Sequence, residues 1–138
     1  MECQPIKQYR PLFKGRPCVL KILWRKGELP QVTNGIYGDK LTQENLSLEH
    51  IVPKCKGGKT ELANLALATK KMNNLRNARN ISGYLNWDSV NLYCKQFQGI
   101  RKKDFSGDRY IKILKQTLRR VFDNNKGGRH ARTIDEQA

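Results

Sequence analysis

The sequence predicts an α+β domain in which two short strands and a helix are followed by further helices. Two short apolar segments, at residues 46–51 and 64–68, stand on either side of a glycine-containing loop and have the length and turn-bounded character of strands. Residues 69–80 then place apolar side chains on neighbouring helical turns, and amphipathic stretches follow at 88–98 and 108–122. The expected order is strand, loop, strand, helix, with additional flanking helices.

The length of the chain, 138 residues, fits one compact domain and is too short for two hydrophobic cores and a linker. We expect this domain to span residues 1–123, with its central motif at 34–80 and a basic helical region at 82–123. Residues 124–138 combine glycines with charged side chains and offer nothing to bury, so we predict a disordered tail.

The first predicted element is a short helix. Pro17 suits its start, and Leu20, Leu23 and Trp24 follow at helical spacing, with a strand as a fair alternative. Residues 27–45 contain turn-forming Asn-Gly and Gly-Asp pairs and are expected to form a loop or hairpin.

The two predicted strands flank a loop. Leu46, Leu48 and Ile51 give the first strand, which Pro53 ends, and residues 64–68 return as the second. The glycine pair within the loop implies a mobile or tightly turned segment.

Polar capping residues mark the predicted helices. Thr69 can cap a helix that runs to about Asn80, where a Ser-Gly pair ends it, and Asp88 can cap a second helix at 88–98. Asp108 opens a third helix. Its apolar side is expected to be core and consists of Ile111, Leu114, Leu118, Val121 and Phe122.

Charge is the strongest signal in the composition. Lys and Arg total 27 against 12 acidic residues, and the net charge of +15 favours a polyanionic partner. The excess is greater at residues 95–132, with 12 basic and 3 acidic residues, than at 41–94, with 7 and 4. We expect DNA as the partner. The residues expected to contact its backbone are Lys54, Lys56, Lys59, Lys102, Lys103, Lys112, Lys115, Arg119 and Arg120.

The cysteines and the apolar runs indicate an intracellular environment. Cys3, Cys18, Cys55 and Cys94 form no C-x-x-C pair, so we interpret them as free thiols. The N-terminus lacks a secretory pattern, and the densest apolar run, residues 19–24, is far shorter than the roughly 20 residues of a membrane span. A soluble cytoplasmic protein is expected.

The residues suited to chemistry lie in one ordered segment. It contains Leu48-Glu49-His50-Ile51-Val52-Pro53, then Gly57-Gly58, then Asn64-Leu65, and finally Asn73-Asn74. Glu49 and His50 are neighbours on a predicted strand, so their side chains should point to opposite faces unless the strand bends locally. No single piece is specific, but the ordered set is.

This segment resembles the HNH, or ββα-metal, nuclease family over roughly residues 34–80. The resemblance implies a ββα-metal (His-Me finger) core and an endonuclease that hydrolyses DNA phosphodiester bonds. It implies that His50 is the general base and that Asn64 holds the loop and the histidine in place. It also implies that Glu49 and Asn73 bind the metal, with Asn74 as the alternative to Asn73.

The implied metal site has oxygen ligands, which suit Mg²⁺ or Mn²⁺ better than Zn²⁺. Arg76, one helical turn beyond Asn73, is expected to clamp the phosphate. Many relatives carry a structural zinc on two C-x-x-C pairs. The equivalent positions here are Asn34, Tyr37, Thr69 and Met72, so no structural zinc is expected and packing by residues 82–122 must replace it.

Two other functions remain open from the residues alone. A non-catalytic nucleic-acid-binding protein could keep the ββα fold and the charge, and it would bind DNA without cutting it. A basic RNA- or ribosome-associated protein would need neither metal nor His50. One site per chain predicts nicking, and a double-strand break would need a homodimer or two sequential events. By analogy, small size and basicity suggest a phage or mobile-element enzyme.

Overall fold

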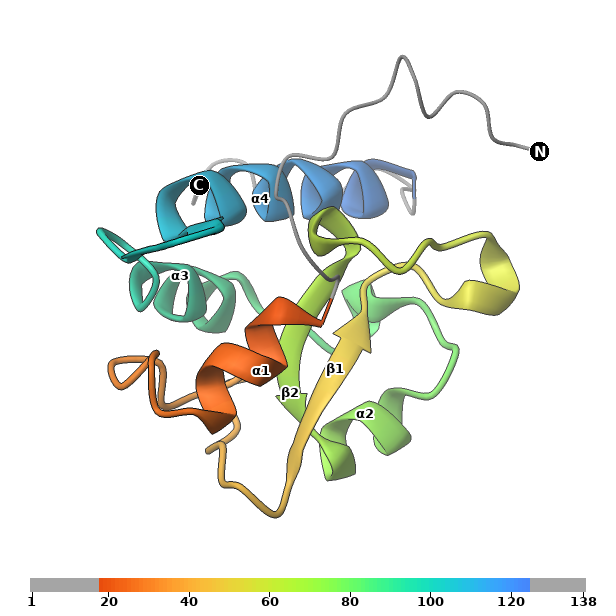
Figure 1. Cartoon of the computed structure of the whole chain (residues 1–138). Coiled ribbons are helices and arrows are strands. Elements are labelled where there is room, and N and C mark those ends of the chain that lie inside the picture. The colour runs from red at the N-terminus through yellow and green to blue at the C-terminus, as the bar shows by residue number, and fades with distance from the viewer. Residues whose placement is uncertain (1–17, 125–138) are drawn as a thin grey trace, which may run out of the picture.

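The computed structural model describes residues 18–124 and has a mixed α+β fold (Figure 1). The predicted fold class is confirmed at this level. Cys3, Pro17 and the predicted tail beyond residue 124 lie outside the described residues. Among the described helices, none has the length and apolar character needed to cross a membrane.

A two-stranded antiparallel sheet lies at the centre of the fold. Strand β1 (Leu46–His50) pairs with β2 (Leu65–Thr69), in a register that runs from Leu46 opposite Thr69 to His50 opposite Leu65. Both predicted strands are therefore present, with ends that differ by one residue. The first predicted element is a helix, α1 (Val19–Arg25), and not the alternative strand. It contacts both β1 and β2.

The outer edge of β2 is closed by groups from distant parts of the chain. The Ile36 amide donates to the Leu67 carbonyl at 2.9 Å, and the Leu67 amide donates to the Tyr93 hydroxyl at 2.9 Å. The Tyr110 hydroxyl donates to the Leu65 carbonyl at 2.7 Å. Because the polar groups of this buried edge find partners, a sheet of only two strands can lie inside the fold.

Helix α2 (Lys70–Arg76) follows β2 directly and is shorter than predicted. The Thr69 hydroxyl accepts a hydrogen bond from the Met72 amide at 3.2 Å, which confirms the predicted cap. The predicted end near Asn80 is wrong, because Asn77 has a φ of 55° and leaves the helical conformation there. The short 3₁₀ helix η4 (Ile81–Gly83) follows as a separate turn.

Helix α3 (Trp87–Lys95) begins one residue earlier and ends three residues earlier than predicted. Its cap is Asn86, whose side-chain oxygen accepts from the Ser89 amide at 2.8 Å, so the prediction of Asp88 as the cap is wrong. Asp88 lies in the first turn instead, where a negative charge favours the helix N-terminus.

The C-terminal part consists of a small hairpin and a long helix. The hairpin of β3 (Arg101–Lys102) and β4 (Phe105–Ser106) was not predicted. Helix α4 (Gly107–Asn124) buries Leu114, Leu118 and Phe122 as expected, whereas Ile111 and Val121 are half-buried. Residues of α3 and α4 contribute heavily to the core, in agreement with the packing role predicted for this region.

The loop between the two strands is tightly turned. It contains the 3₁₀ helices η2 (Lys54–Lys56) and η3 (Leu62–Asn64), and Gly57 between them has a φ of 91°. A Cβ on Gly58 would lie 1.8 Å from the Val52 carbonyl oxygen, so only glycine fits there. Helix α4 packs against η3 and supports the loop from behind.

Residues 27–45 form the hairpin-like turn that the sequence allowed. An isolated antiparallel bridge joins Asn34 to Lys40, and the Gly35 amide donates to the Asp39 carbonyl at 2.7 Å. This turn lies against β2 through the Ile36 contact described above, which brings Tyr37 close to β1.

Candidate active site

An open pocket of about 440 Å³ lies where β1 ends and α2 runs beside it. Of the five residues expected to perform chemistry or bind metal, Glu49, His50 and Asn73 line it, whereas Asn64 and Arg76 do not. Lys54 and Cys55 from the loop also contribute to its wall. The remaining lining residues are Pro53, Asn74, Asn77 and Ala78.

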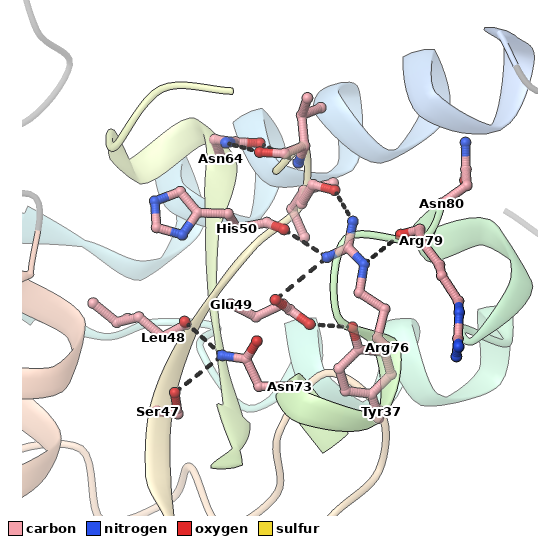
Figure 2. A network of polar contacts seen from close by, with 12 residues as sticks. Tyr37, Ser47, Leu48, Glu49, His50, Asn64, Asn73, Arg76, Arg79 and Asn80 are labelled. Carbon is pink, nitrogen blue, oxygen red and sulfur yellow. Dashed lines mark hydrogen bonds and ion pairs between the residues drawn. The ribbon is translucent and has the colours of Figure 1, made fainter. Parts of the chain in front are cut away.

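Glu49 and His50 point to opposite sides of β1, as their adjacency in a strand predicts (Figure 2). The pairing with β2 is regular through both residues, so no bulge in β1 brings them to the same face. Both residues still line the pocket, which lies where β1 ends and the chain turns into η2.

The His50 ring is partly buried and contacts a hydroxyl group of the loop. Its Nε2 lies 2.9 Å from the Thr60 hydroxyl, a contact that the sequence did not indicate. Partial burial lowers the pKa of His50, and the positive charges of Lys54 and Arg76 lower it further. The ring is therefore predominantly neutral near pH 7, which is the state a general base requires.

The Glu49 carboxylate is almost completely buried, with 3% of the residue exposed. The Tyr37 hydroxyl donates to Oε2 at 2.5 Å, and Oε1 lies 3.3 Å from Nη1 of Arg76 (Figure 2). Burial raises the pKa of Glu49, while the Tyr37 hydrogen bond and the Arg76 charge oppose this rise. Burial also raises the pKa of Tyr37, so its hydroxyl remains a proton donor to the carboxylate.

Arg76 has a different position from the one expected. It is 1% exposed, and its guanidinium donates to the backbone carbonyls of Arg79, His50 and Ile51 at 2.6, 2.6 and 2.7 Å. The predicted phosphate clamp does not fit this burial, because the donors are already used inside the protein. Arg76 instead ties the end of β1 to the turn that follows α2.

Asn73 presents an amide oxygen at the pocket. Its Nδ2 donates to the Ser47 hydroxyl and to the Leu48 carbonyl, both at 3.0 Å. Because a carbonyl can only accept, the amide nitrogen must face β1, and Oδ1 has no partner among the described residues. Asn74 also lines the pocket, but no hydrogen bond within residues 18–124 fixes its amide. The geometry thus favours Asn73 over Asn74 as a ligand.

Asn64 lies outside the pocket and holds the loop together. Its side chain is buried, and its Oδ1 accepts from the Val52 amide at 2.9 Å. Its Nδ2 donates to the carbonyls of Val52 and Lys59 at 3.0 and 2.9 Å. These contacts join the start and the end of the loop, so the loop-holding contacts expected of Asn64 are present.

The expected DNA-contacting residues lie on the loop, the hairpin and α4. Lys54 lines the first pocket, and Lys59 shares a second pocket of about 350 Å³ with Arg120. Lys115 is half-buried. The others are exposed, namely Lys56, Lys102, Lys103, Lys112 and Arg119.

The oxygen ligands at the pocket suit a hard divalent cation. Within residues 18–124, no three His, Cys, Asp or Glu side chains come together. Glu49 and Asn73 both line the pocket and carry oxygen atoms in their side chains, and the open pocket leaves room for water and phosphate oxygens. Glu49 is fixed in position but is also engaged by Tyr37 and Arg76, so a cation would share this carboxylate with them.

The positions equivalent to zinc-binding cysteines have other contacts here. The side-chain nitrogen of Asn34 donates to the Gly38 carbonyl, and the Tyr37 hydroxyl donates to the Glu49 carboxylate. Thr69 caps α2. Met72 is half-buried on α2. Tyr37, like Thr60, is a site residue that sequence reasoning missed, because the pattern marked it only as a missing cysteine.

Comparison of the chain with protein-family models, with curated proteins and with solved structures finds no match.

Proposed function

We propose that this protein is a metal-dependent HNH endonuclease that hydrolyses DNA phosphodiester bonds. The observation that carries the proposal is the common pocket of Glu49, His50 and Asn73, built by a strand, a loop, a second strand and a helix in the order that the resemblance implies. In this proposal β1, β2 and α2 are the ββα-metal core, and α1, α3 and α4 are its flanking helices.

His50 is the general base of the proposed reaction. A neutral imidazole can take a proton from the attacking water, and its lowered pKa keeps it neutral. The Thr60 hydroxyl at Nε2 fixes the ring, which leaves the other ring nitrogen for the proton transfer. Asn64 supports this arrangement indirectly, because it holds the loop that contains Thr60.

Glu49 and Asn73 would hold Mg²⁺ or Mn²⁺ in the proposed site. When bound, such a cation neutralises charge on the scissile phosphate and stabilises the leaving oxygen. Glu49 supplies the only carboxylate of the pocket among the described residues, and Asn73 supplies an amide oxygen that hydrogen bonds from its own nitrogen hold in place. Lys54 adds positive charge at the pocket for the DNA backbone.

The proposal is tested with supercoiled plasmid in Mg²⁺, in Mn²⁺ and in EDTA. We expect metal-dependent conversion to nicked circles, and a loss of about 10²-fold or more in His50→Ala, as expected for removal of a general base. Asn73→Ala should need more metal for the same rate, and Asn74→Ala is its matched control. Equal nicking by the wild-type protein and His50→Ala would refute the assignment.

A non-catalytic DNA-binding protein is the second candidate, and the engagement of both Glu49 oxygens favours it. It requires salt-sensitive DNA binding without cleavage in any metal. Binding measured by fluorescence anisotropy in EDTA, beside the plasmid assay, separates these two functions.

A further inference from the structure

The carboxylate of Glu49 is held by two side chains from different parts of the chain. Arg76 comes from the last turn of α2 and contacts Oε1, whereas Tyr37 comes from the turn before β1 and contacts Oε2 (Figure 2). The Tyr37 contact is the shorter of the two, at 2.5 Å against 3.3 Å. The short Tyr37 contact therefore limits how the carboxylate can rotate, and Oε1 keeps the longer and weaker of the two contacts.

The backbone around Tyr37 is itself fixed by hydrogen bonds from α3 and from Gln96, the residue that directly follows this helix. Gln96 accepts from the amides of Thr33 and Asn34 at 2.9 and 3.0 Å and donates to the Asn34 carbonyl at 2.9 Å. The Ser89 hydroxyl donates to the Ile36 carbonyl at 3.1 Å. The turn is thus held against α3 both at the Asn34–Lys40 bridge and at Ile36, next to Tyr37.

The same turn is also fastened to β2. Asp39 Oδ2 accepts from the Thr69 amide at 2.7 Å, and Gly35 lies so close to the strand that a Cβ would be 2.9 Å from the Leu67 carbonyl oxygen. With contacts to α3 and to β2, the turn has little freedom to move Tyr37. A hydroxyl on such a support can orient a neighbouring ligand.

We infer that Tyr37 is a positioning residue of the proposed metal site, because its hydroxyl fixes Oε2 of Glu49 and so presents Oε1 for the cation. Partners that orient a metal ligand affect metal affinity although they do not touch the metal. Tyr37 acts in this way through Glu49. The inference rests on the proposed function, since it needs a cation at Glu49 and Asn73.

The test measures binding of Mn²⁺ to the DNA-free protein, so its readout does not depend on cleavage. Paramagnetic broadening of the NMR signals of Ser47, Glu49 and Asn73 gives an apparent dissociation constant for Mn²⁺. We expect Tyr37→Phe to weaken Mn²⁺ binding by about tenfold or more, the usual range for loss of such a partner. Tyr84→Phe is the matched control, because its hydroxyl contacts Arg79 outside the pocket, and it should leave the affinity unchanged.

The outcomes separate this inference from the proposed function. If wild-type protein and Asn73→Ala give the same Mn²⁺ affinity, the metal site itself is wrong. If Asn73→Ala weakens binding but Tyr37→Phe equals wild type or binds more tightly, only the positioning role is wrong. Circular dichroism melts show whether Tyr37→Phe folds. Should it not fold, Gln96→Ala loosens the turn instead and must weaken Mn²⁺ binding, or the inference fails.

Discussion

The buried charges of Glu49 and Arg76 organise the site at the scale of single residues. Each charge loses hydration on burial, and only close partners offset that cost. Arg76 finds them in Glu49 and in three backbone carbonyls, so it determines where β1 ends relative to α2. In the sequence, an arginine one helical turn after Asn73 looks as well suited to binding a phosphate as to a buried position. The two cannot be distinguished there, because the burial of Arg76 depends on the path of the chain between the two strands.

The order of residue types predicted part of this site. Glu49, His50 and Asn73 do share a pocket, and Asn64 does hold the loop. Thr60 and Tyr37 were missed because each meets its partner only after the chain has turned back. Their hydroxyls lie 10 and 12 positions from those partners, and no periodicity joins them.

We expect His50 to titrate below the ordinary histidine pKa of 6.5. Burial and the charges of Lys54 and Arg76 disfavour the imidazolium, so the folded protein binds this proton less readily than the unfolded chain. The contribution of His50 to stability should therefore fall as the pH drops from about 6.5 through the lowered pKa. NMR titration of the imidazole in metal-free protein measures this pKa.

A matched pair of variants checks the cause of that shift. Lys54→Gln removes a nearby positive charge and should raise the pKa of His50, whereas Lys56→Gln removes an exposed charge on the same loop and should change it less. A His50 that titrates above 6.5 in the wild-type protein would contradict the expectation.

At the scale of elements, local sequence signals located most helices and strands but not all of their ends. Thr69 and β2 were predictable, because a capping residue follows an apolar run. The end of α2 was not, since Asn77 leaves the helix through a backbone conformation that its sequence neighbours do not require. The β3–β4 hairpin was missed because each strand has only two residues, too few for a pattern of alternation.

The strand-connecting loop has a position that only glycine can occupy. Gly58→Ala would place a Cβ 1.8 Å from the Val52 carbonyl oxygen, so the loop must shift, and we expect a loss of about 2 kcal/mol in the free energy of unfolding. Gly83→Ala is the matched control, because no atom lies within 4 Å of its added Cβ. Urea denaturation measures both. Equal midpoints would show that the loop accommodates a side chain.

At the scale of the whole molecule, α4 brings the C-terminal basic residues to the strand-connecting loop. Lys59 from the loop and Arg120 from α4 line the same pocket, and Lys112 and Arg119 are exposed on that helix. The net charge in the sequence predicted a polyanionic partner but not this arrangement, which depends on α4 packing against η3. Positive charge from the middle of the chain and from its C-terminal helix thus lies together at the loop beside the proposed active site.

We expect this surface to contribute to DNA affinity through counterion release. The double variant Arg119→Gln, Arg120→Gln should reduce the slope of log affinity against log salt by about 2, or about 1 for each lost phosphate contact. Arg25→Gln, Lys26→Gln makes the same change of charge at the end of α1, outside both pockets, and should alter the slope less. Equal slopes for the two variants, measured by anisotropy in EDTA, would place the DNA elsewhere.

The hydrogen bonds between Gln96 and the backbone of Thr33 and Asn34 determine when the site can form during synthesis of the chain. Gln96 lies 63 positions after Thr33 and 62 positions after Asn34 in the sequence. Tyr110, whose hydroxyl donates to the Leu65 carbonyl, lies 45 positions after Leu65. A growing chain therefore carries β1, the loop and α2 outside the ribosome before the residues that hold Tyr37 and β2 have been made. We therefore expect the pocket to reach its final form only when the chain has been translated to about Tyr110, so a chain that ends earlier should lack the complete pocket.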